Sequence, residues 1–347
     1  MKIGTRSIGR DHPPFVIAEM SGNHNQSLDR ALAIVDAAAA AGAHALKIQT
    51  YTAETMTLDV REPGFVIEDP ASPWHGRSLH DLYEEAHTPW EWHAPIFERA
   101  RALGMIPLST PFDETAVDFL DSLGSEVYKI ASFENRDLPL IRRAASKGRP
   151  IIISSGMATL ADLDEAVRTA RGAGCPGVIL LKCTSTYPAT PEDSNLATLP
   201  HMREMFGCEV GLSDHTAGIG AAVCSVAFGA TVIEKHFTMR RSDGGVDSAF
   251  FLEPEEMKAL VEESLRAWTA IGAVRYGPTA REKSSLQFRR SIYVTRDLAV
   301  GDSLSRENIR IIRPGFGLPP SDWDIVLGMK VTRVIRRGEA LTWDALR

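Results

Sequence analysis

Eight short apolar segments recur between residues 15 and 237, and longer amphipathic segments separate them. The short segments are FVIAEM, ALKIQT, MIPLST, VYKIAS, PIIISSG, VILLKCT, EVGLSDH and TVIEKHF. Short runs rich in Ile and Val indicate strands that are buried on both faces, as in a parallel sheet. Eight such strands with mostly helical connections, followed by a helix over 254–271, predict a (β/α)8 TIM barrel. A doubly wound sheet is the alternative, but no GxGxxG fingerprint follows the first strand.

The chain beyond the barrel divides into a linker and a small module. We expect a TIM-barrel domain over residues 1–272 and a polar linker over 273–289, AVRYGPTAREKSSLQFR. A module of short strands follows over residues 290–347, with turns at Gly301-Asp302 and Arg337-Gly338. A module of this size would bury only a marginal core alone, so we expect it to pack on a barrel.

Composition and charge narrow the class of protein. The chain has 347 residues and a formal net charge of −7, which argues against a nucleic-acid partner. No apolar run approaches the length of a membrane span, and the N-terminal residues lack the apolar region of a secretory signal. The four cysteines have no CxxC spacing, so a zinc knuckle or redox pair is not expected. We therefore expect a cytoplasmic protein without a membrane partner.

Polar residues end the predicted strands, at the end of the barrel where TIM-barrel enzymes carry out their chemistry. His215 and His236 end the last two strands, which are neighbours in a closed barrel, and Glu19 ends the first strand beside them. Two imidazoles and a carboxylate suit a divalent ion such as Mn²⁺, Co²⁺ or Fe²⁺. The alternative is that each histidine is only a hydrogen-bonded core residue.

Two lysines, Lys47 and Lys129, lie within apolar strands, where an unpaired ammonium group is costly. They could form internal salt bridges to Glu19 or Glu234. They could instead bind an anion together with the Ser and Thr hydroxyl groups at other strand ends. A Schiff-base lysine, as in barrel aldolases, is a third interpretation, but it does not explain the paired histidines.

Two further features concern the chain after the second strand. Residues 51–87 interrupt the alternation and are rich in Pro, Gly and charged residues, so we expect a loop or lid near the site. The next segment, HTPWEWHAPIFERARALG, predicts a helix with Thr88 as N-cap, Pro89 at its first position and Glu91 completing a capping box.

Six motifs in chain order give the sequence a resemblance to a known family. IAEMSGNHNQSLDRA, ALKIQTYTAETMTLD, YKIASFE, KCTSTYP, GLSDHTAG and IEKHFT, followed by RPGFGLPP, resemble the sialic acid (nonulosonic acid) synthases over essentially the whole chain. The C-terminal module is similar to the SAF domain, an antifreeze-like, β-clip fold. The resemblance implies a transferase that condenses phosphoenolpyruvate with an open-chain amino sugar and water, releasing phosphate. It also implies a domain-swapped homodimer.

The resemblance implies roles for particular residues. His215 and His236 would hold a divalent metal, with Mn²⁺ expected first and Co²⁺ or Mg²⁺ as alternatives, and Glu19 would be the acidic residue beside it. The residues that match the phosphoenolpyruvate site are Lys47, Thr110, Lys129, Ser132, Ser154, Ser185 and Ser213. Those that match the sugar site are Gln49, Tyr187, Asp247 and, from the partner chain, Arg313.

Within the family, the sequence looks more like the pseudaminic acid synthases. Ser185 stands where N-acetylneuraminate synthases commonly carry Asn, and KIQTYT, TPWEWH, KCTSTYP and RPGFGLPP match the pseudaminic subgroup. Its substrate is 2,4-diacetamido-2,4,6-trideoxy-L-altrose. The alternatives are an N-acetylneuraminate or legionaminate synthase, a Schiff-base pyruvate aldolase, and a protein that binds carbohydrate through the SAF-like module.

Overall fold

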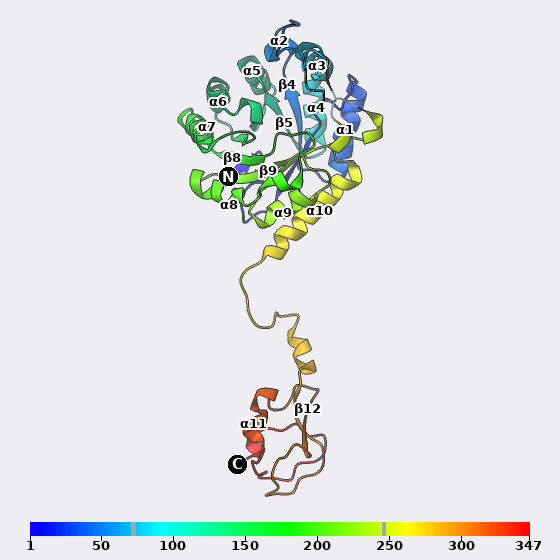
Figure 1. Cartoon of the computed structure of the whole chain (residues 1–347), viewed down its shortest axis with the longest axis vertical. Helices are drawn as coiled ribbons and strands as arrows, with labels where there is room; N and C mark the ends of the chain where they lie inside the picture. Colours follow the sequence, from blue (N-terminus) through cyan, green and yellow to red (C-terminus); the bar gives the residue numbers. More distant parts are fainter. Residues whose placement is uncertain (71–73, 245–247) are drawn as a thin grey trace. The chain divides into compact units, whose positions relative to one another are not determined.

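The first compact unit of the protein is a closed parallel barrel. The computed structural model describes residues 1–70, 74–244 and 248–347, which divide into the units Met1–Gly272 and Ala273–Arg347. In the first unit the eight strands follow one another around the barrel in chain order, and the last pairs with the first (Figure 1). The strands are β3 Phe15–Glu19, β4 Ala45–Thr50, β5 Ile106–Pro111, β6 Tyr128–Ile130, β7 Ile151–Ser154, β8 Val178–Cys183, β9 Glu209–Asp214 and β10 Val232–His236. The predicted TIM barrel is confirmed.

Helices surround the barrel, and their apolar faces pack on the outer faces of the strands. They are α1 Leu28–Ala40, α4 Trp90–Ala102, α5 Glu114–Ser122, α6 Leu138–Ala145, α7 Leu160–Gly172, α8 Thr198–Phe206, α9 Gly220–Ala227 and α10 Pro254–Ile271. The predicted cap of α4 is wrong, because Pro89 is its N-cap and no side chain caps the helix. Thr88 is buried instead, with Oγ1 3.2 Å from His24 Nε2.

An N-terminal hairpin that the sequence pattern did not predict closes the amino end of the barrel. It consists of β1 Lys2–Ile3 and β2 Arg6–Ser7, which pair antiparallel. Ile3 and Ile8 are buried in one apolar cluster with residues at the starts of the strands, including Phe15 and Val232. The interior is therefore filled with side chains at this end, and a site has room only at the other.

The segment after β4 contains two short helices, α2 Ala53–Met56 and α3 Leu79–Ala86, which lie beside the carboxyl end of β4 (Figure 1). Short one-turn 3₁₀ helices follow several strands or lie in the second unit, at Ser132–Glu134, Pro191–Ser194, Arg241–Asp243, Ser248–Phe250, Lys283–Phe288, Pro320–Asp322 and Trp343–Ala345. Ser132–Glu134 directly follows β6 and so belongs to the carboxyl end of the barrel.

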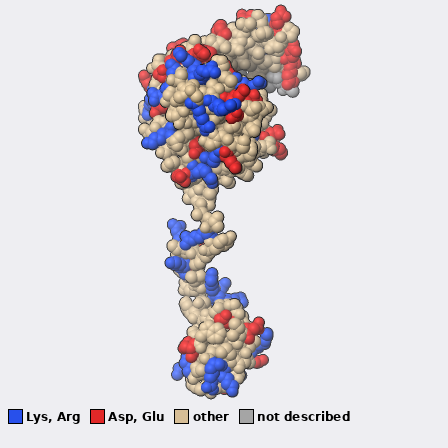
Figure 2. All heavy atoms as spheres, turned by 90° about the vertical axis from the view of Figure 1, so that its left-hand side faces the viewer, with Lys and Arg blue, Asp and Glu red and all other residues tan. Residues whose placement is uncertain are grey.

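The second unit has its own small core. Strands β11 Ser291–Val294 and β12 Ile309–Ile312 pair antiparallel, and helix α11 Trp323–Val326 follows. Its apolar cluster includes Ile292, Leu298, Val331 and Leu341. Basic and acidic side chains are interspersed over the faces of both units drawn in Figure 2. Among the described residues no helix is both long and apolar enough to cross a membrane.

Candidate active site

The inward-facing side chains change from apolar to polar along each barrel strand. On β3 the series is Phe15, Ile17 and Glu19, with the two apolar residues in the interior cluster. On β10 it is Val232, Glu234 and His236. Because alternate residues of a strand point to the same face, the last inward residues all gather at the carboxyl end. The register places His236 beside Glu19, and Glu19 beside Lys47.

A cavity of about 380 Å³ opens at this end of the barrel. Ten residues predicted from the sequence line it: Glu19, Lys47, Gln49, Lys129, Ser132, Ser154, Tyr187, Ser213, His215 and His236. Thr110 and Ser185 lie behind this lining, where Thr110 accepts a hydrogen bond from Lys47 and Ser185 Oγ is 3.8 Å from Cys183 Sγ. Asp247 lies outside the described residues. Arg313 belongs to the second unit, where it is exposed.

The two lysines are joined to two carboxylates on the floor of the cavity. Lys47 Nζ is 3.0 Å from Glu19 Oε2 and 3.5 Å from Glu234 Oε1, and Lys129 Nζ is 3.7 Å from the same Glu234 oxygen. All four side chains are at most 5% exposed. The salt bridges considered from the sequence are therefore present. They do not exclude anion binding, because they fix both ammonium groups at the cavity surface. The carboxylates of Glu19 and Glu234 raise the pKa of Lys47 against the effect of burial, whereas burial lowers the pKa of Lys129.

Hydroxyl groups and a glycine surround Lys129. Its ammonium donates to Ser154 Oγ at 2.6 Å, and Ser132 Oγ accepts from the Gly156 backbone N–H at 3.2 Å. A Cβ atom at Gly156 would lie 2.5 Å from Ser132 Oγ and 2.1 Å from Ser185 Oγ, so any side chain there would collide with both. Ammonium, hydroxyl and backbone N–H groups together provide the donors that a phosphate or carboxylate needs.

The two histidines face each other with ring centroids 5.2 Å apart. His215 Nδ1 lies 2.8 Å from the Thr184 carbonyl oxygen, and donating to this oxygen leaves the lone pair on Nε2. His236 Nδ1 is buried and has no hydrogen-bond partner among the residues that the structure describes. Burial, reinforced by His215 and Lys47, lowers the pKa of His236 well below its usual value, so its ring is neutral. Burial opposes a raised pKa at His215, but the contacts with Cys183 and the Thr184 carbonyl raise it, so a metal ion would displace a proton that is more readily held there. A neutral imidazole with an unused nitrogen is what a metal ion requires, and His236 meets this condition.

Glu19 is suited to holding a proton. Burial, together with the nearby Glu234 carboxylate, raises its pKa, although Lys47 opposes the shift. Glu19 Oε1 also accepts a hydrogen bond from Gln49 Nε2 at 3.0 Å, which fixes the carboxyl group at the cavity wall. A buried carboxyl with a raised pKa holds a proton more readily than an ordinary carboxyl and can exchange it with a reacting group.

Two carboxyl groups were not assigned to the site from the sequence. Glu234 pairs with both lysines and accepts a hydrogen bond from Ser213 at 3.1 Å. It lies two residues before His236 on the same strand, and this spacing could have predicted that its side chain points into the barrel. Glu134 ends the YKIASFE motif, and its buried Oε2 has no hydrogen-bond partner within residues 1–70, 74–244 and 248–347. Burial raises the pKa of Glu134 to about 7, against the opposing effect of Lys129.

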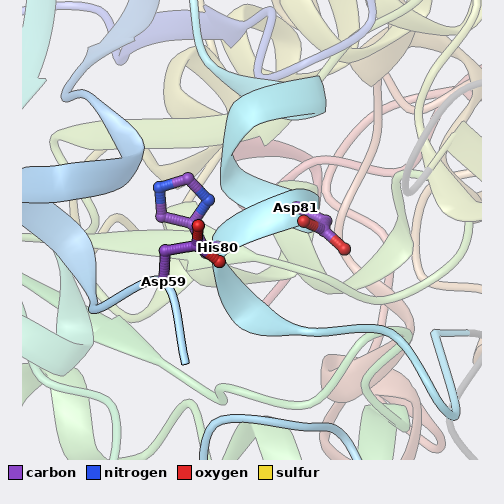
Figure 3. A group of neighbouring side chains, drawn as sticks. All are labelled: Asp59, His80 and Asp81. Carbon is purple, nitrogen blue, oxygen red and sulfur yellow. The ribbon is translucent and has the colours of Figure 1, made fainter. Parts of the chain in front are cut away.

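Asp59, His80 and Asp81 form a separate group of possible metal ligands. Their ligand atoms lie within 4.8 Å of one another, with His80 and Asp81 at the start of α3 and Asp59 in the preceding loop (Figure 3). Asp81 already pairs with Arg61 at 2.7 Å, and His80 lies 3.6 Å from Glu54. None of the three lines the cavity. Asp81 and His80 therefore each have a partner of opposite type outside the group.

Comparison with known proteins gives matches over both units. Residues 34–276 match the NeuB family, and residues 289–347 match the SAF domain. The chain is 41% identical to a pseudaminic acid synthase of Campylobacter jejuni over 98% of each chain. It is 40% identical to one of Helicobacter pylori over 96% of this chain and 97% of that one. A crystal structure of N-acetylneuraminic acid synthetase from Leptospira borgpetersenii matches with 31% identity and a TM-score of 0.73, over 83% of this chain and 95% of that one.

These matches agree with the motifs and the geometry. The NeuB match covers more than half of the chain, and the two curated relatives cover nearly all of it. The sialic acid synthase resemblance seen in the sequence is thereby confirmed, and the chain belongs to the NeuB family.

Proposed function

We propose that the protein is a pseudaminic acid synthase, which condenses phosphoenolpyruvate with 2,4-diacetamido-2,4,6-trideoxy-L-altrose and water to give pseudaminic acid and phosphate. One observation carries the proposal: a single cavity joins a floor of lysines and hydroxyl groups to a pair of facing imidazoles. The names of the Campylobacter jejuni and Helicobacter pylori relatives support the choice of sugar.

Phosphoenolpyruvate would bind on the lysine floor. Its phosphate and carboxylate would be held by Lys47 and Lys129, with hydroxyl groups from Ser132, Ser154 and Ser213, and the Gly156 N–H would orient the Ser132 hydroxyl. Thr110 and Ser185 would support this floor from behind. Because the ammonium groups are already fixed by Glu19 and Glu234, little reorganisation accompanies binding.

The sugar would bind between Gln49, Tyr187 and the two histidines, with Asp247 and the partner chain's Arg313 completing the site. The Tyr187 ring lies 4.5 Å from the His215 ring, so it can cover one face of the sugar. His215 and His236 would hold a divalent metal, for which Mn²⁺ is the first candidate. When bound, such an ion would act as a Lewis acid toward the aldehyde oxygen.

The reaction forms two bonds and breaks one. Carbon 3 of phosphoenolpyruvate bonds to the aldehyde carbon, whose oxygen gains the electron pair and then a proton. Water adds to carbon 2 and gives up a proton. Glu19, which lines the cavity, would accept this proton in its ionised form. The bond between carbon 2 and the phosphate oxygen then breaks, the departing phosphate takes the proton of the carbon 2 hydroxyl, and the keto group is left. Lys47 and Lys129 stabilise the charge on the departing phosphate.

The proposal includes a cytoplasmic, domain-swapped homodimer. Arg313 is exposed in the second unit and forms no ion pair with the residues that the structure describes. A guanidinium without a partner in its own unit is available to a sugar acyl group bound elsewhere. The SAF match over residues 289–347 supports assigning a separate role to this unit.

The test is phosphate release from phosphoenolpyruvate with Mn²⁺, comparing the 6-deoxy diacetamido-altrose with N-acetylmannosamine. Turnover with the altrose alone is expected, and ¹⁸O placed in the bridging oxygen of phosphoenolpyruvate should appear in phosphate. Turnover with N-acetylmannosamine alone would instead assign the protein to the N-acetylneuraminate synthases. Release with neither sugar would overturn the proposal.

Two controls examine the mechanism. A chelator should abolish turnover and Mn²⁺ should restore it, whereas full activity of metal-free His215→Ala, His236→Ala enzyme would exclude the metal role. Borohydride reduction in the presence of pyruvate should leave Lys47 and Lys129 unlabelled. Covalent labelling of either lysine would favour the aldolase alternative, because only a Schiff base is trapped in this way.

A further inference from the structure

Part of the cavity lining is apolar, and most of it comes from one segment, residues 51–87, with Ala131 and Phe133 adding to it from the turn after β6. The polar lining described above comes from the ends of the barrel strands and the turns that follow them. The apolar lining from this segment consists of Ile67, Trp74, Leu79, Leu82, Tyr83 and Ala86, called the segment wall below. The site therefore has charged groups on the barrel side and hydrocarbon on the segment side.

The segment wall is fixed to its surroundings. The Ile67 N–H donates to the Arg77 carbonyl and the Leu79 N–H to the Phe65 carbonyl, both at 2.9 Å. Ser78, which is 1% exposed, caps α3 by accepting from the Asp81 N–H at 3.1 Å. Gln26, from the loop before α1, donates to two carbonyl groups at the end of α3, those of Glu85 and His87, at 2.9 Å each.

Packing also joins the segment wall to the barrel. The ring of Tyr83 meets that of Tyr51, which directly follows β4, edge to face with centroids 5.8 Å apart. A Cβ atom at Gly22, after β3, would lie 3.2 Å from the Ala86 carbonyl oxygen, so helix α3 approaches the barrel closely there. Yet Ile67, Leu79 and Tyr83 remain only half-buried, because they border the open cavity. Their exposed surface is available to a ligand.

We propose that the segment wall determines which sugar the enzyme accepts, by contacting the apolar substituents of a deoxy sugar such as the methyl group at carbon 6. The inference rests on the proposed function and adds the structural element that selects the substrate. A 6-hydroxyl group placed against this hydrocarbon would lose its water without gaining a hydrogen-bond partner. The aliphatic part of the wall, Ile67, Leu79 and Leu82, would reject an added hydroxyl by roughly 10–100-fold in kcat/KM.

The test introduces a polar group into the segment wall without changing its size. Leu79→Asn is the main variant, and Ile67→Thr is a second in case the first does not fold. Leu58→Asn is the matched control, because Leu58 lies in the same segment but is 63% exposed and does not line the cavity. Phosphate release is measured with the 6-deoxy sugar and with its 6-hydroxy counterpart.

Wild type and Leu58→Asn should prefer the 6-deoxy sugar, and each wall variant should lower this preference about tenfold. The KM for phosphoenolpyruvate should stay unchanged, because Lys47 and Lys129 lie on barrel strands β4 and β6 and the substituted residues lie in the segment after β4. Equal loss of kcat/KM for both sugars in both wall variants would overturn the inference, as would a wild type that accepts both sugars equally. A wild type that releases phosphate with neither sugar would overturn the proposed function, and the inference with it.

Discussion

At the scale of single residues, Glu134 makes the stability of the barrel depend on pH. Its carboxyl group faces Lys129, Lys47, Asp137 and Tyr83, and burial raises its pKa from the ordinary 4.5 to about 7. Between these two pH values the unfolded chain releases the proton and the folded chain keeps it. The free energy of unfolding therefore falls as pH rises through this interval, and it stops falling above it.

Replacing Glu134 by Gln removes this dependence. The variant should gain stability over wild type as pH rises from about 4.5 to 7, by up to roughly 3 kcal/mol for a shift of this size. Urea unfolding at several pH values, followed by a signal from the barrel, measures the difference. Glu98→Gln, at an exposed position on α4, is the control and should track wild type. A constant difference between Glu134→Gln and wild type at all pH values would show that the carboxyl titrates normally.

At the scale of elements, a buried ion pair joins β9 to β10 on the outer face of the barrel. Lys235 Nζ lies 2.7 Å from Asp214 Oδ2, the two side chains are 1% and 2% exposed, and Lys235 also donates to the Thr216 carbonyl. The pair directly precedes His215 on one strand and His236 on the other. It therefore holds the two strand ends that position the imidazoles.

Removing one partner leaves the other charge buried and alone. Lys235→Met should lower the free energy of unfolding by about 3–5 kcal/mol, measured by urea unfolding. Adding Asp214→Asn to this variant should recover part of the loss, because the remaining group is then uncharged. Asp214→Asn is also made alone. If it lowered the free energy of unfolding of the Lys235→Met variant as much as it lowers that of wild type, the two residues would not act as a pair.

The same elements show how far the sequence predicts the structure. All eight barrel strands were predicted, because each is an apolar run buried on both faces, and the strand-end residues followed from alternation and barrel closure. The two-residue strands of the N-terminal hairpin are too short to carry a pattern. The Thr88 cap was wrong because its hydroxyl bonds to His24, a contact between residues 64 positions apart. The segment wall was also beyond prediction, since its apolar residues have no regular spacing.

At the scale of the whole molecule, the linker separates two units with separate cores. Residues 273–285 are all exposed and include Arg275, Arg281 and Lys283, and basic side chains lie along this stretch in Figure 2. A linker of this kind allows the second unit to serve either its own barrel or that of a partner. The proposed function requires the second case.

Subunit complementation distinguishes the two cases. His236→Ala removes a metal ligand from the barrel, and Arg313→Ala removes the arginine from the second unit, so each variant alone should be inactive or strongly impaired. In a swapped heterodimer, one site combines the intact barrel of one chain with the intact Arg313 of the other, and its companion site carries both substitutions. Random pairing of equal amounts should therefore restore about a quarter of wild-type phosphate release.

The outcome depends on which barrel each Arg313 serves. If Arg313 serves the barrel of its own chain, every active site in the mixture lacks either His236 or Arg313. In that case the mixture would be no more active than the two variants measured separately. Co-refolding from denaturant ensures that the chains exchange, and sedimentation confirms that the mixture is dimeric. As a control for chain exchange, wild type co-refolded with an equal amount of the double variant His236→Ala, Arg313→Ala should show about a quarter of the activity of the same total amount of wild type, because in the swapped arrangement only the wild-type homodimers then have complete sites. Recovery near a quarter would place Arg313 in the partner's active site.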